Sequence, residues 1–165
     1  VGAALPTKQL PVDRIARICE EVQYPLILMG GPSERSMGEA IASTDPGKIY
    51  NACGKFSLNE SADLLRRSRL VVTPDTGMMH IAAALQKPVL SIWGNTVPKF
   101  GMYPYYGQIR SAATEDRFEV KGLSCRPCSK IGYRKCPRGH FNCMRQQDIP
   151  SIVQQIHFRL GKNVG

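Results

Sequence analysis

The sequence has few acidic side chains, since 13 Asp and Glu stand against 22 Lys and Arg, and the formal net charge is +9. It has no apolar run as long as a membrane span, which excludes an obvious spanning helix. It also lacks an RNA-binding aromatic motif and zinc-finger spacing, so nothing supports a nucleic-acid-binding protein beyond the charge itself. The shortage of acids favours anionic partners such as phosphates or an acidic membrane surface.

The first residues lack the basic start and long apolar centre of a secretory signal. Six cysteines without such a signal predict reduced thiols in the cytoplasm. The chain of 165 residues does not open with Met, and residues 1–5 resemble the end of a strand. We therefore expect one domain, cut as a fragment at a domain boundary.

Residues 70–85 are the most informative stretch and predict a buried strand, a tight turn and a helix. Pro74 should end the strand pairing because it has no N–H to donate. Asp75, Thr76 and Gly77 then supply a carboxylate, a hydroxyl and a residue free to take positive φ. These groups meet the N–H groups of a helix start, which attract phosphates. On these residues alone, a plain helix cap made by Asp75 or Thr76 stays an equal alternative.

The same alternation of apolar runs and helical patterns recurs along the chain. Ser57 and Glu60 have capping-box spacing, and Ser33 is a second candidate helix cap. The alternation predicts an α/β fold with a Rossmann-like parallel sheet and helices on both faces. Strands are predicted at residues 25–30, 48–52, 70–72, 87–93 and 118–121, and helices at residues 11–22, 33–43, 57–67, 78–85 and 151–160.

Each loop that follows a strand should reach the same edge of a parallel sheet, where ligands bind in this class of fold. Taken singly, Lys8 could be a solvated lysine and Glu34 a favoured acid in a first helical turn. Together they offer phosphate- and sugar-binding groups in one crevice. The groups expected there are Lys8, Glu34, Phe56, residues 75–77 and residues 94–96.

Several of these motifs resemble the ADP-heptose–lipopolysaccharide heptosyltransferases of glycosyltransferase family 9. The similarity covers nearly the whole chain, and the Asp-Thr-Gly-x-x-His block is its most specific part. The tail is similar to the heptosyltransferase II branch. The motifs are residues 7–11, 30–34, 75–80, 82–84, Pro88 and 94–98, followed by 125–128, 136–140 and 143–144 in the tail.

The resemblance implies that residues 1–165 form one donor-binding domain, the C-terminal half of a two-domain GT-B enzyme, with a Cys-rich basic loop at residues 122–147. Lys8 would neutralise the donor diphosphate, Asp75 would bind sugar, and His80 would support the pocket. The donor-binding set it implies is Thr7, Lys8, Glu34 at the ribose, Phe56 at the adenine, Asp75, Thr76, Gly77, Met78 and His80.

The resemblance also implies a function for the whole enzyme, namely transfer of heptose from ADP-heptose, or a similar nucleotide sugar, to the lipopolysaccharide inner core. The catalytic base would lie in the absent N-terminal domain, so this chain should hold no catalytic residue and be inactive alone. No metal or other cofactor is required if Lys8 and the helix N–H groups stabilise the leaving diphosphate. The enzyme would be cytoplasmic and bind no nucleic acid. A peripheral contact with the anionic inner membrane stays an open alternative. The alternative is a non-catalytic nucleotide-binding or regulatory module of the same fold.

The cysteines of the tail suggest two interpretations. Cys125 and Cys128 have zinc-ligand spacing, whereas Cys136 and Cys143 do not. We therefore favour a structural loop of free thiols, with zinc as the alternative. Basic residues in this segment would face either solvent or an anionic membrane or acceptor phosphate; they are Arg126, Lys130, Arg134, Lys135, Arg138 and Arg145.

Overall fold

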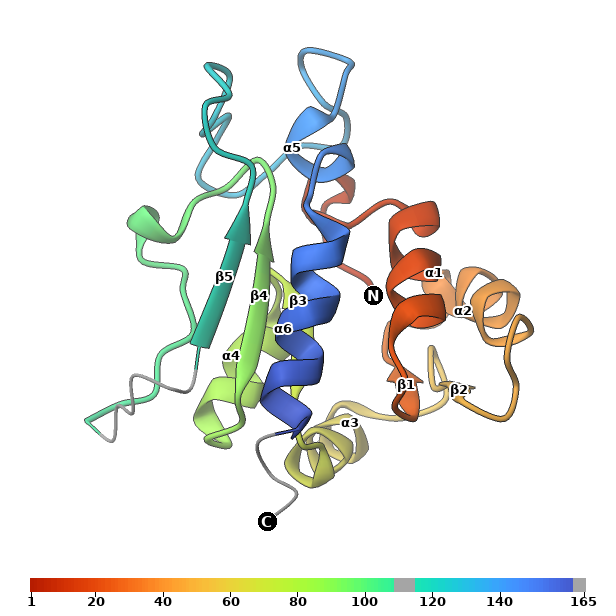
Figure 1. Cartoon of the computed structure of the whole chain (residues 1–165). Coiled ribbons are helices and arrows are strands. Elements are labelled where there is room, and N and C mark those ends of the chain that lie inside the picture. The colour runs from red at the N-terminus through yellow and green to blue at the C-terminus, as the bar shows by residue number, and fades with distance from the viewer. Residues whose placement is uncertain (109–114, 162–165) are drawn as a thin grey trace.

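The computed structural model describes residues 1–108 and 115–161 and confirms the α/β class (Figure 1). Short strands alternate with helices through most of the chain. In order, the elements are η1 (Pro6–Lys8), α1 (Val12–Glu21), β1 (Leu26–Leu28), η2 (Pro32–Glu34), α2 (Arg35–Ala42), β2 (Ile49–Asn51), α3 (Leu58–Arg67), β3 (Val71–Pro74), α4 (Gly77–Ala84), β4 (Val89–Trp93), η3 (Pro98–Phe100), β5 (Glu115–Glu119), α5 (Asn142–Arg145) and α6 (Ile149–Gly161).

All pairings among the described strands are parallel, but they form two sheets where the sequence predicted one. β1 pairs with β2, and β4 lies between β3 and β5. Residues 1–5, predicted to end a strand, have no strand conformation. The Val1 amino group donates one hydrogen bond to the carbonyl of Met29, the residue after β1, and a single bond does not make a ladder.

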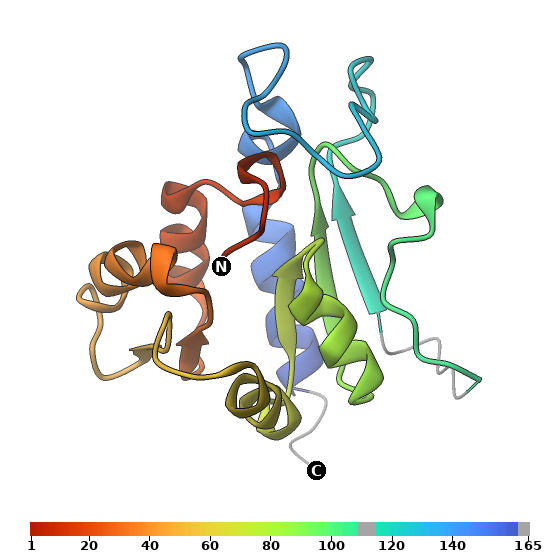
Figure 2. The same cartoon turned by 180° about the vertical axis from the view of Figure 1, so that it is seen from behind.

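Helices cover both faces of the larger sheet, as predicted. α6 lies on one face and α4 on the other, as the two opposite views show (Figures 1 and 2). β4 is buried along all five of its residues, which suits an apolar strand covered on both sides. The larger apolar cluster joins α1, β1 and α6, and a second one gathers around Trp93 and α4.

Local signals were most reliable where a cap or a breaker fixes an element's end. The capping box of α3 is present, with the Glu60 N–H donating to Ser57 Oγ and the Ser57 N–H donating to Glu60. Pro74 ends β3, as expected. Ser33 is not a cap; it lies within η2, and its hydroxyl donates to the neighbouring Glu34 carboxylate. α5 was not predicted, and β5 begins three residues before its predicted start.

None of the helices in the described part of the chain is both long enough and apolar enough to span a bilayer.

Candidate functional site

The turn between β3 and α4 is held by a buried network around Asp75. Thr76 is the N-cap residue of α4, but neither it nor Asp75 makes a side-chain cap bond in the structure, so the plain-cap alternative is wrong. Asp75 Oδ2 instead lies 2.7 Å from Lys8 Nζ and accepts a 2.9 Å hydrogen bond from Thr96 Oγ1. Three of the loops predicted to converge, those carrying residues 8, 75–77 and 94–96, therefore do meet.

A pocket with a volume of about 230 Å³ opens beside this network. Five of the predicted site residues line it. Its apolar wall is formed by residues that were not predicted to belong to the site. The lining residues are Ala4, Leu5, Lys8, Asp75, Thr76, Gly77, His80, Met102 and Ile131. Met102 and Ile131 lie in irregular segments, where no local pattern marks them as pocket residues.

The electrostatics of the pocket combine a shielded ion pair with a helix start. The side chains of Lys8 and Asp75 are 14% and 5% exposed, so their attraction is little screened by water. The first N–H groups of α4, from Gly77 and Met78, have no partner within a helix. A Cβ atom added at Gly77 would have no heavy atom within 4 Å, so a ligand can approach this helix start closely. Such a site suits an anion bound next to a hydroxyl-bearing group.

Thr7 lies outside the pocket lining and holds a distant loop. Its side chain is buried, at 2% exposure. Its Oγ1 donates to the Tyr133 carbonyl at 2.8 Å and accepts from the Tyr133 N–H at 2.7 Å. In this structure Thr7 thus connects η1 to the Cys-rich loop directly beside Lys8.

Three more predicted donor-binding residues lie outside the pocket lining. The Glu34 carboxylate accepts from the Gly31 N–H at 2.7 Å and from Ser33, which is the structural role that its first-turn position suggested. Phe56 is exposed after β2, and Met78 is half-buried against the second apolar cluster. A contact of Glu34 with ribose or of Phe56 with adenine stays a prediction.

All six cysteines are free thiols. Cys125 Sγ lies 3.8 Å from His140 Nε2, and Cys128 Sγ donates to the Cys125 carbonyl at 2.9 Å. Burial raises the pKa of the Cys143 thiol to about 11. Across residues 1–108 and 115–161, no three His, Cys, Asp or Glu side chains come together in an arrangement that could hold a metal ion.

Comparison with known proteins points to one family. The family model of glycosyltransferase family 9 (heptosyltransferase) matches residues 2–124. Lipooligosaccharide heptosyltransferase 2 of Haemophilus influenzae is 34% identical over 102 residues, which are 58% of this chain and 30% of the relative. The chain is similar in fold to E. coli ADP-heptose lps heptosyltransferase II, with a TM-score of 0.75 and 19% identity over 99% of this chain and 46% of the other.

A further solved structure of similar fold is the dodecameric iron-containing heptosyltransferase TibC in complex with ADP-D-beta-D-heptose. Its TM-score is 0.64 at 17% identity, covering 98% of this chain and 44% of that one. The matches to these relatives thus cover less than half of their length.

Proposed function

We propose that this chain, which belongs to glycosyltransferase family 9, is the donor-binding half of a heptosyltransferase whose sugar donor is ADP-heptose. The observation that carries the proposal is the meeting of Lys8, Asp75 and the start of α4 at one pocket. Residues 1–165 would form this one domain. The acceptor would be the lipopolysaccharide inner core, and the enzyme would work in the bacterial cytoplasm, at the inner membrane where its glycolipid acceptor is held.

Lys8 and α4 would bind the diphosphate of the donor. An ammonium group has three N–H donors, and the contact with Asp75 uses one of them. The others can reach a phosphate while the ion pair stays intact. The N–H groups of Gly77 and Met78 would add a fixed positive end of the helix dipole. In the transfer step the same groups would stabilise the negative charge that develops on the leaving nucleoside diphosphate, so that no metal ion is needed for this task.

Asp75 would bind the sugar and not act as the catalytic base. Its contacts with Lys8 and Thr96 both fall on Oδ2. Oδ1 is therefore the atom placed to accept a hydrogen bond from a sugar hydroxyl. The base would belong to the acceptor-binding domain, and this chain alone would not catalyse transfer.

Calorimetric titration of the chain with ADP, ADP-heptose and a short DNA duplex tests this function. We expect both nucleotides to bind, and Lys8→Ala and Asp75→Ala each to weaken ADP-heptose binding without unfolding the domain. Lys48→Ala is a matched control, because Lys48 forms a surface ion pair with Asp45 away from the pocket lining. Binding of DNA alone, with a steep dependence on salt, would contradict the proposal. Binding of ADP without any preference for the nucleotide sugar would favour the non-catalytic nucleotide-binding module.

A further inference from the structure

We infer that residues 129–138, here named the basic strap, form a contact surface for an anionic lipid bilayer. The strap belongs to the Cys-rich loop, and it begins beyond residues 2–124, where the family model matches. The bilayer contact depends on the strap alone. Its use in sugar transfer to a membrane-held acceptor rests on the proposed function.

The strap carries a positive charge that no carboxylate in the described part of the chain neutralises. No Asp or Glu occurs between Glu119 and Asp148. Glu119 lies 3.0 Å from Arg126, and the Asp148 carboxylate accepts hydrogen bonds from Ser151, so both flanking acids are already engaged. No ion pair among the described residues involves the exposed basic residues of the strap, which are Lys130, Arg134, Lys135 and Arg138.

Arg126 differs from these four residues, although the sequence groups it with them. Its side chain is 7% exposed, and its guanidinium donates to the carbonyl groups of Gly94, Val120 and Thr96. Arg126 therefore fixes the base of the loop to the end of β4. The charges available to a partner are those of the four exposed basic residues of the strap.

Two large apolar side chains stand among the charges. Ile131 is 63% exposed and Tyr133 is 41% exposed. The Tyr133 hydroxyl donates to the Cys128 carbonyl at 3.1 Å, which fixes the direction of the ring. Exposed aliphatic and aromatic groups between Lys and Arg side chains suit a bilayer interface, where apolar tips enter the headgroup region and cations meet anionic lipids. A nucleic acid would use the charges but offers no place for the isoleucine.

The strap is anchored in one position relative to the pocket. The Gly132 N–H donates to Ser129 Oγ at 2.6 Å, and Gly132 has a φ of +110°, which favours glycine. A Cβ atom there would come within 3.2 Å of Leu5 and Thr7. Because Thr7 also holds Tyr133 by three hydrogen bonds, Ile131 is placed in the pocket wall. A bilayer bound by the strap would therefore lie next to the mouth of the donor pocket.

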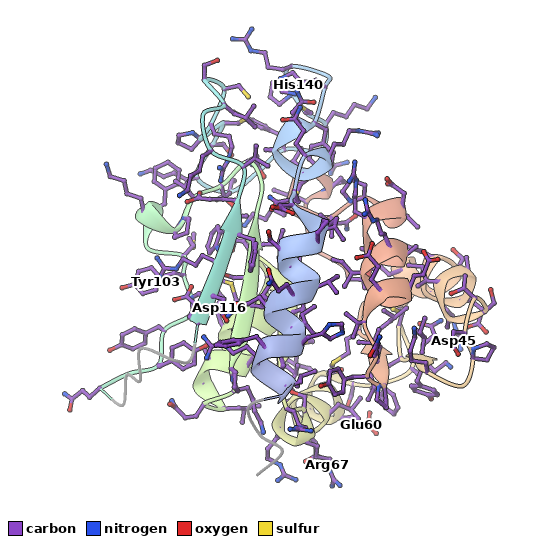
Figure 3. All side chains as sticks on the ribbon, in the orientation of Figure 1. Asp45, Glu60, Arg67, Tyr103, Asp116 and His140 are labelled. Carbon is purple, nitrogen blue, oxygen red and sulfur yellow. The ribbon has the colours of Figure 1, made fainter. Side chains whose placement is uncertain are left out.

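Flotation with phosphatidylcholine vesicles, with and without phosphatidylglycerol, tests the contact. The strap variant is Lys130→Gln/Arg134→Gln/Lys135→Gln. The control variant is Lys55→Gln/Arg66→Gln/Arg67→Gln, which removes the same number of charges. Arg67 lies at the opposite end of the molecule from His140, which follows the strap (Figure 3).

We expect the wild type to float with the anionic vesicles only. One basic residue near such a surface contributes about a fivefold increase in partitioning, so the strap variant should lose about 100-fold. The control variant should stay close to wild type. Ile131→Asn should lower partitioning even at high salt, where the charges are screened.

Equal partitioning of the strap and control variants would overturn the inference, and so would preferential binding of a DNA duplex over the vesicles at the same salt concentration. Calorimetry with ADP separates the two proposals, because the three residues of the strap variant do not line the pocket. If vesicle binding depends on the strap while the wild type fails to bind ADP, the membrane contact stands and the donor site is wrong.

Discussion

Replacing Asp75 by Asn should tighten the binding of ADP, whereas the affinity for ADP-heptose should stay level or fall. Asp75 Oδ2 lies 2.7 Å from Lys8 Nζ, so a phosphate bound on the far side of the ammonium would be about 6 Å from the carboxylate. At an effective dielectric constant of about 20, two like charges at about 6 Å repel by about 3 kcal/mol. We take about half of this value, because solvent and counterions screen the mouth of the pocket.

Asp75→Asn should therefore tighten ADP binding by about 1.5 kcal/mol, or roughly tenfold. The binding of ADP-heptose gains from the same loss of repulsion. It also loses the hydrogen bond from a sugar hydroxyl to the charged carboxylate, which is worth about 1.5–3 kcal/mol. Its affinity should consequently stay level or fall. The expected signature is a fall of tenfold or more in the ratio of ADP-heptose affinity to ADP affinity.

Isothermal titration calorimetry at low salt measures both affinities, and a melting curve of each variant verifies that the domain is folded. Asp45→Asn is the control, because it removes a carboxylate from a surface ion pair that is not part of the pocket lining. If Asp75→Asn weakens ADP and ADP-heptose equally, Asp75 acts by holding Lys8 in place, and the assignment of Oδ1 to the sugar is refuted.

Three further predictions concern the fold. Ser57→Ala removes the N-cap of α3 and should cost about 1 kcal/mol of unfolding free energy, measured by urea denaturation; no loss would mean that the cap is not formed in solution. Gly38→Ala would place a Cβ atom 2.3 Å from Oδ1 of the buried Asn51 and should destabilise by about 1–3 kcal/mol, whereas an unchanged melting temperature would contradict this packing. At pH 8 iodoacetamide should modify the partly exposed Cys125 well before Cys143. Burial raises the pKa of the Cys143 thiol to about 11, so this thiol stays protonated until the pH rises towards that value. Mass spectrometry would show the order of modification, and early modification of Cys143 would contradict the prediction.

The elements that sequence predicted well are those specified by neighbouring residues. The Ser57–Glu60 box, the breaker Pro74 and the apolar run of β4 each act within a few positions of the chain. Local chemistry therefore located four of the five strands and the ends of α3. The first residues were misjudged because strand conformation depends on a partner, and an apolar start does not reveal whether a ladder exists.

The pocket depended on contacts that no local pattern contains. Lys8 and Asp75 were expected to converge because the loops after parallel strands share an edge, and they form an ion pair. A contact of Thr7 with the ligand stays a prediction; its partner Tyr133 lies 126 positions away, so no local pattern indicates that its hydroxyl is already hydrogen-bonded. Ile131 was missed for the same reason, since its place in the pocket wall follows from that long-range contact.

The Thr7–Tyr133 hydrogen bonds have a consequence for folding. Thr7 and Tyr133 are 126 positions apart, and closing a loop of this length costs chain entropy before any contact offsets that cost. The hydrogen bonds between them should therefore form late in folding. Ile131 completes the pocket lining only after that closure, because the other lining residues lie in distant parts of the chain, at positions 4, 5, 8, 75–77, 80 and 102. A ligand of this pocket would consequently recognise the fully folded chain and no earlier intermediate, so that it would slow unfolding much more than it would speed folding.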